Sequence, residues 1–110
     1  MDLLQMQMKA LGLPIPEKEY RFHPKRRFRF DWAFVANMLG VEQDGGVWVR
    51  GRHSRGAGQI KDMEKLNAAS ILRWWVLRFT PQQVEKGEAA LTIQRWFDER
   101  RKDETNGRKT

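Results

Sequence analysis

The chain has 110 residues, a length that suits one domain. Its 21 Lys and Arg residues against 14 Asp and Glu residues give a net charge of +7, which favours a polyanionic partner, nucleic acid before membrane. Because the chain has no cysteine, a disulfide scaffold, a thiolate zinc site and a cysteine nucleophile are excluded. No apolar run approaches the roughly 20 residues of a membrane span, and the first residues lack a signal-peptide pattern, so we expect a cytoplasmic protein with no membrane partner.

The first part of the chain predicts one helix followed by strands. Apolar residues recur at helical spacing over 3–13, and Gly12 and Pro14 are typical of a helix end. Alternation of polar with aromatic or apolar residues then predicts three strands, at 19–22, 27–34 and 38–42.

The second of these strands alternates most regularly. Four aromatic side chains are expected on one face, which we interpret as core because the helices need an apolar surface to pack on: Phe28, Phe30, Trp32 and Phe34. The opposite face is expected to carry Arg27, Arg29, Asp31 and Ala33.

The rest of the chain predicts a loop, two helices and a further strand. Residues 45–58 hold five Gly and three Arg, which indicates a basic loop. Helical spacing follows over 59–72, then a buried strand over 74–79, and Thr80-Pro81 begins a last helix that is expected to reach about residue 101 with a weak point at Gly87. The order αβββαβα predicts an α/β fold, a small mixed sheet flanked by helices in a single domain over 1–101, with a polar tail over 102–110.

Three acidic residues fall near the ends of consecutive predicted strands. If the second and third strands form a hairpin, Asp31 and Glu42 lie side by side, with Asp44 two residues further on. Adjacent carboxylates repel unless a cation lies between them, and oxygen ligands suit Mg²⁺ or Mn²⁺. Such an ion stabilises the charge that develops when a phosphodiester is hydrolysed.

Basic residues surround these acids in the sequence. They are expected to hold a nucleic-acid backbone, and Trp48 is the candidate for base stacking within the basic loop. The candidate nucleic-acid-binding residues are Arg27, Arg29, Trp48, Arg50, Arg52, Arg55 and Lys65. On composition and spacing alone, a purely structural alternative is favoured: the acids form ordinary ion pairs with the neighbouring arginines.

The ordered set of segments resembles the PD-(D/E)XK nuclease superfamily, in particular its small phage and bacterial branch related to very-short-patch-repair endonucleases. The resemblance runs from Arg27-Phe28-Arg29-Phe30-Asp31 and Val41-Glu42-Gln43-Asp44 through Lys61-Asp62-Met63-Glu64-Lys65 to Trp75-Val76-Leu77-Arg78-Phe79. It covers about residues 10 to 97 and implies a restriction-endonuclease-like αβββαβ core.

The resemblance also implies roles for individual residues. Asp31 matches the first metal-binding aspartate, Glu42 the acid of the E-x-K element, and the carbonyl of Gln43 a main-chain ligand. Asp44 stands where many members carry the catalytic lysine. The alternatives are that Asp44 itself binds metal or acts as a base, or that a cation has moved elsewhere: Lys61, Lys65 or His53.

Four further residues have expected roles. Glu19 resembles an acid that some members of the superfamily add to the site. Asp62 is an alternative partner for an arginine of the loop. One of Trp74 and Trp75, which begin a strand and point to opposite faces, is expected in the core and the other at the surface or an interface.

These observations predict a Mg²⁺-dependent DNA endonuclease. A chain of this size has little surface for reading a long base sequence, so we expect cutting directed by structure, at nicks, flaps, branches or junctions, with a homodimer if two strands are cut. One alternative is an inactive nuclease-fold module that only binds nucleic acid. Another is a basic structural or regulatory protein, which predicts no metal affinity.

Overall fold

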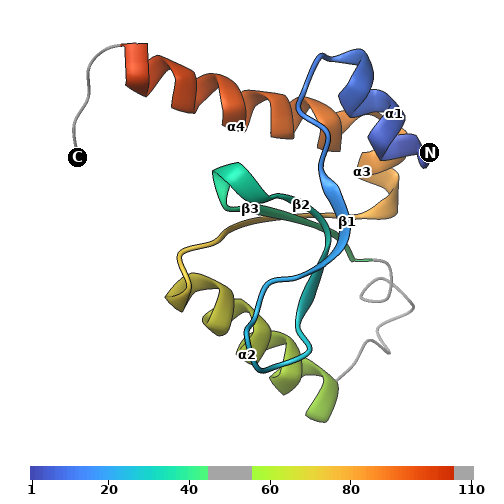
Figure 1. The fold of residues 1–110 in the computed structure, drawn as a ribbon. Helices are drawn as coiled ribbons and strands as arrows, with labels where there is room; N and C mark the ends of the chain where they lie inside the picture. Colours follow the sequence, from blue (N-terminus) through green and yellow to red (C-terminus); the bar gives the residue numbers. More distant parts are fainter. Residues whose placement is uncertain (45–55, 106–110) are drawn as a thin grey trace. The chain divides into compact units, whose positions relative to one another are not determined.

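The computed structural model describes residues 1–44 and 56–105 (Figure 1). Its contacts divide the chain into two compact units, Pro16–Pro81 and a second one made of Met1–Ile15 with the segment that begins at Gln82. We call them the sheet unit and the helical unit.

The sheet unit holds a four-stranded mixed sheet with strand order β1-β2-β3-β4. The strands β1, β2 and β3 pair antiparallel, and β3 pairs with β4 in parallel. A parallel pair needs a crossover, and the helix α2 provides it between β3 and β4. The bounds of these elements are β1 (Glu17–Arg21), β2 (Arg29–Phe34), β3 (Leu39–Gln43), α2 (Ala57–Ile71) and β4 (Trp75–Phe79).

Two short connections join the antiparallel strands. Between β1 and β2, the Nδ1 atom of His23 accepts the backbone N–H groups of Lys25 and Arg26 at 3.0 and 2.8 Å, which closes the predicted turn. Between β2 and β3, a short 3₁₀ helix η1 (Val35–Asn37) ends at Met38, whose φ of 55° reverses the chain. The structure confirms an α/β fold with a small mixed sheet and helices.

An aromatic cluster fills the space between α2 and the sheet. Phe22 and Phe30 stack with ring centroids 4.2 Å apart, and Trp74 packs 5.2 Å from Phe30. Ala69 of α2 is fully buried in the same cluster, so the helix contributes small side chains where the aromatic rings are large. Trp74 is the core member of the Trp74-Trp75 pair, as predicted, while Trp75 is 56% exposed.

The strict alternation expected along β2 is wrong at one point. Ala33, expected opposite Phe30, belongs to the same cluster as Phe30, while Trp32 and Phe34 are buried outside it. Gly40, which pairs with Ala33, lies against the Phe30 ring so closely that a Cβ there would come within 2.5 Å of it. Between Phe30 and Ala33, the strand β2 therefore changes which of its two faces packs against the aromatic cluster.

The neighbouring strand β1 is irregular at the same level of the sheet. Glu19 of β1 lies between the pairs Lys18–Trp32 and Tyr20–Phe30, opposite Asp31, and has a φ of 53°. A left-handed residue inside a strand interrupts the regular pleat, because successive side chains no longer alternate there. The alternation of residue types in a sequence predicts a regular strand, and it does not indicate where the strand is interrupted.

The helical unit contains α1 (Leu3–Ala10), α3 (Pro81–Glu85) and α4 (Glu88–Thr105). Asp2 and Gln5 form a reciprocal capping box at the start of α1, and Gln7 donates to the carbonyl of Val84 at 3.1 Å. The buried apolar residues of this unit are Leu4, Met8, Val84, Ala89, Ala90 and Ile93.

The single last helix predicted over 82–101 is wrong, because it is divided in two. Gly87 has a φ of 81°, a conformation that ends α3 and lets the chain restart as α4. The helix does begin at Pro81 as predicted, and α4 continues to Thr105, past the expected boundary at residue 101. Within residues 1–44 and 56–105, no helix combines the length and apolar character that a membrane span requires.

Candidate active site

The candidate site lies in the sheet unit, where the end of β3 meets β2 and α2. Asp31 is half-buried in β2, and its Oδ2 atom accepts the backbone N–H of Gln43 at 2.9 Å. Because Gln43 directly follows Glu42, this hydrogen bond joins the first acidic residue to the segment that carries the second. The prediction that these two strands, β2 and β3, lie next to each other is confirmed.

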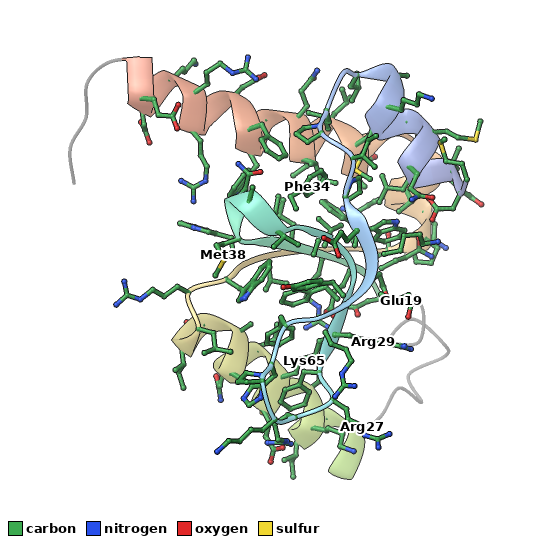
Figure 2. All side chains as sticks on the ribbon, in the orientation of Figure 1. Glu19, Arg27, Arg29, Phe34, Met38 and Lys65 are labelled. Atoms are coloured by element: carbon green, nitrogen blue, oxygen red, sulfur yellow. The ribbon has the colours of Figure 1, made fainter. Side chains whose placement is uncertain are left out.

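Glu42 is a buried acidic residue of the sheet, with 5% of its surface exposed. Its Oε2 atom accepts a hydrogen bond from Nζ of Lys65, which comes from α2 (Figure 2). Its Oε1 atom lies 3.6 Å from Nε of Arg78 in β4, an ion pair rather than a hydrogen bond. A carboxylate removed from water needs such partners, since an unpaired buried charge is costly.

Lys65 is set apart from the other lysines by its surroundings. Burial lowers the pKa of its ammonium group, and the positive charges of Arg78 and Arg29 lower it further, while the negative charge of Asp31 opposes them. The Nζ atom also lies 5.8 Å from the centre of the Phe30 ring. Lys65 is therefore held between both acidic residues and the aromatic cluster, and its lowered pKa makes it a better proton donor than an exposed lysine.

Arg78 connects three elements through its guanidinium group. Its Nη2 atom lies 2.8 Å from the carboxylate of Asp44, and its Nη1 atom donates to Asp62 of α2 at 3.0 Å. Burial opposes the positive charge, but the hydrogen bonds to both aspartates outweigh it and raise the pKa of Arg78, which stays charged. Asp62 thus pairs with a strand arginine, while the arginines of the loop, its predicted alternative partners, lie outside the described residues.

Sequence reasoning missed Arg78. The only signal was one charged residue inside an otherwise apolar strand, two positions after Val76, which packs against the aromatic cluster. Because residues two apart share a face of a strand, this placed Arg78 on the face covered by α2. Its partners could not be foreseen, since Asp62 and Asp44 lie 16 and 34 positions away in the sequence.

A hollow of about 350 Å³ opens beside Asp31 and Lys65. It lies between the start of β2 and the first half of α2, and its lining mixes cationic and acidic side chains around one ring. The lining residues are Arg27, Phe28, Arg29, Asp31, Gly58, Lys61, Asp62 and Lys65. The volume is at the small end of the range typical for ligand sites.

The cations of the hollow divide into two kinds. Arg29 pairs with Glu19 at 2.9 Å (Figure 2), and Lys65 is engaged by Glu42. For Arg27 and Lys61, both exposed, no ion pair occurs with any residue that the structure describes. These two side chains offer positive charge to an incoming anion.

Several sequence predictions lie outside the described residues. They concern the basic loop and its candidates for base stacking, acid–base chemistry and backbone binding: Trp48, Arg50, Arg52, His53 and Arg55.

The carboxylates that the structure brings together suit a hard divalent cation in their chemistry. Asp31 and Glu42 carry carboxylate oxygens on neighbouring strands, and Mg²⁺ commonly uses one or two carboxylates together with water and phosphate. In the described part of the chain, no group of three or more His, Cys, Asp or Glu side chains is arranged as a metal site. Asp44, a predicted metal ligand, is instead engaged by Arg78.

Comparisons of the chain with known protein families, with curated proteins and with solved structures give no match.

Proposed function

We propose that the protein is a metal-dependent endonuclease that hydrolyses phosphodiester bonds in DNA. The observation that carries the proposal is the pairing of Lys65 with Glu42 beside Asp31. In the segment that resembles the E-x-K element of PD-(D/E)XK nucleases, Asp44 stands where the lysine is expected. A lysine supplied by α2 restores the combination of two carboxylates and a cation, and the element order α1-β1-β2-β3-α2-β4 agrees with the expected core.

The chain's own residues have separate roles in this proposal. Asp31 and Glu42 would hold the divalent ion. Lys65 orients the attacking water and donates a proton from Nζ to the leaving oxygen, a task suited to its lowered pKa, while the proton of the attacking water passes to solvent. When bound, Mg²⁺ or Mn²⁺ would supply Lewis-acid stabilisation of the charge on the phosphate oxygens.

The roles of the two lysines differ from those expected from the sequence. From the sequence, Lys61 and Lys65 were alternatives for the catalytic cation, and only Lys65 was also a candidate for DNA binding. The geometry distinguishes them, because Lys65 engages Glu42 while Lys61 lines the hollow without an ion pair in the described residues. In the proposal, Lys61 and Arg27 bind the phosphates that flank the scissile bond.

The substrate remains the structure-directed class: nicked, flapped, branched or junction DNA. The hollow is small, and a site of this size contacts few base pairs. Cutting two strands at a junction requires two sites, for which a homodimer is the simplest arrangement.

A second candidate function is a nucleic-acid-binding module without catalysis. It is favoured by the neutralisation of Glu42, whose carboxylate is engaged by both Lys65 and Arg78. A carboxylate that serves only as an internal ion-pair partner has no need of a divalent ion. This candidate predicts DNA binding that is unaffected by Mg²⁺ and no cleavage.

The test is nicking of supercoiled plasmid by the full chain with Mg²⁺ or Mn²⁺. We expect cleavage that stops with EDTA and with Asp31→Asn, while the matched variant Asp98→Asn on α4 cuts like the wild type. An intact plasmid with both metals, together with salt-sensitive DNA binding, would favour the binding module. Neither cutting nor binding would leave both functions without support.

A further inference from the structure

One charged residue of the candidate site has no role in the proposed chemistry. Arg78 touches neither the hollow nor Asp31, yet it engages Glu42, Asp44 and Asp62. Two of these acidic residues are well placed to repel an incoming phosphate. The side chains of Asp62 and Asp44 are 43% and 29% exposed, and Asp62 lines the hollow.

The charges around the hollow depend on this arginine. Four carboxylates gather near the end of β3 and the start of α2: Asp31, Glu42, Asp44 and Asp62. Two cations pair with three of them, Lys65 with Glu42, and Arg78 with Glu42, Asp44 and Asp62. Without Arg78, two aspartates keep their charge and nothing in the described residues is seen to pair with them.

We infer that Arg78 is a positioning residue for substrate: it neutralises Asp44 and Asp62 and holds both carboxylates on its guanidinium group, so that a DNA backbone can enter the hollow beside Lys61. The inference rests on the proposed function, which supplies DNA as the ligand, but it concerns binding and needs no metal. Like charges facing one another across an interface suppress association, so uncovering two carboxylates weakens it.

The geometry suits this role better than a purely structural one. The guanidinium reaches Asp62 with both terminal nitrogens, at 3.0 and 3.2 Å, and Asp44 at 2.8 Å. Planar forks of this kind fix the direction of a carboxylate as well as its charge. Asp62 lies one position after Lys61 on α2, so holding Asp62 on Arg78 also fixes the helix turn that presents Lys61.

The test measures binding of a fluorescein-labelled DNA duplex by anisotropy in EDTA, where cleavage cannot occur. We expect Arg78→Met to weaken binding about tenfold, because it uncovers the charge of Asp62, which lines the hollow, and the charge of Asp44. Arg95→Met on α4 is the matched control, since it removes the same charge from the helical unit, and we expect a change below about twofold.

The decisive variant is the charge rescue. Adding Asp44→Asn and Asp62→Asn to Arg78→Met removes both carboxylates, and binding should return to within about threefold of the wild type. A structural role for Arg78 predicts no rescue, because the triple variant has lost the same contacts. In the wild-type background, the Asp44→Asn/Asp62→Asn pair should bind DNA more tightly than the wild type, and this holds even if Arg78→Met fails to fold.

Three results with the variants would overturn the inference. They are unchanged binding by a folded Arg78→Met, a triple variant as weak as Arg78→Met, and an Asp44→Asn/Asp62→Asn pair that binds no more tightly than the wild type. A wild-type chain that binds no DNA overturns the inference and the proposed function together. Binding that follows the expected pattern in a chain that never nicks plasmid supports the inference and contradicts the endonuclease.

Discussion

The helices α2 and α4 carry similar mixtures of charged side chains but use them differently. In α4, Arg101 pairs with Asp98 at 3.7 Å and Lys102 with Glu99 at 3.6 Å, within one turn of the same helix. All four side chains are at least half exposed, so these pairs contribute about 0.5 kcal/mol or less each.

In α2 the charged side chains reach other elements. Asp62 extends to β4 and Lys65 to β3, and Lys65 is 20% exposed where its partner Glu42 is 6% exposed. An ion pair that joins two elements away from water fixes the position of a side chain. A pair within one exposed helix turn does not. The net charge of +7 therefore indicates only that a polyanionic partner is favoured. The candidate site is located by the ion pairs that join α2 to the strands.

The sharpest form of this comparison removes one lysine from each helix. Lys65→Met should lower the free energy of unfolding by about 3 kcal/mol, because Glu42 stays buried with only the longer contact to Arg78. Lys102→Met on α4 should change it by less than about 0.5 kcal/mol. Urea unfolding of both variants measures the difference. Equal losses for the two would contradict the distinction between the helices.

A second change acts on the ring beneath Lys65 rather than on a charge. Gly40→Ala should cost about 2 kcal/mol, because the new methyl group meets the Phe30 ring at 2.5 Å and forces it toward α2. Thermal unfolding measures the loss, and Ala36→Gly, at an exposed position of η1, serves as a control for altering a small side chain. A Gly40→Ala variant as stable as the wild type would show that Phe30 has room to move.

A third change tests whether Lys61 faces DNA. Lys61→Ala should weaken duplex binding by about 1 kcal/mol and lower the slope of log affinity against log salt by about one, as expected for one lost phosphate contact. Lys86→Ala in the helical unit is the control for charge and should leave the slope unchanged. Identical slopes for the two variants would remove Lys61 from the proposed interface.

The smallest expected effect lies on α4. Asp98→Asn breaks the pair with Arg101 between two exposed side chains and should change the free energy of unfolding by less than about 0.5 kcal/mol. Chemical denaturation is precise enough to set this limit. A loss above about 1 kcal/mol would mean that α4 uses its charges as α2 does, and the contrast between the two helices would disappear.

The elements of the fold could be predicted because their signals are local. The strand over 74–79, the helix over 59–72 and the helix start at Pro81 each follow from a few neighbouring residues, and the structure has them at Trp75–Phe79, Ala57–Ile71 and Pro81. The breaks were harder to predict. Gly87, recognised as a weak point of the helix, adopts a left-handed conformation that divides it, but a glycine alone does not show whether a helix will end there. Glu19 is also left-handed, and its residue type gives no signal of that conformation.

The candidate site was predictable only in part, for a related reason. Asp31 and Glu42 could be placed together because strand pairing follows from a hairpin. The choice between Lys61 and Lys65 depends on which turn of α2 faces β3, and a 3.6-residue period alone does not fix that rotation. The ion pairs of Arg78 depend on the same packing of α2 on the sheet, because its partners come from the end of β3 and from α2.

The central claim is that Lys65 belongs to the cleavage chemistry and Lys61 to DNA binding. The most direct measurement is single-turnover nicking by Lys65→Met and Lys61→Met with Mg²⁺, at protein concentrations that saturate the DNA. The account predicts that Lys61→Met cuts at nearly the wild-type rate once bound, while Lys65→Met is slower by about 100-fold or more. A Lys65→Met variant that cuts like the wild type, or a Lys61→Met variant that remains slow at saturation, would contradict it.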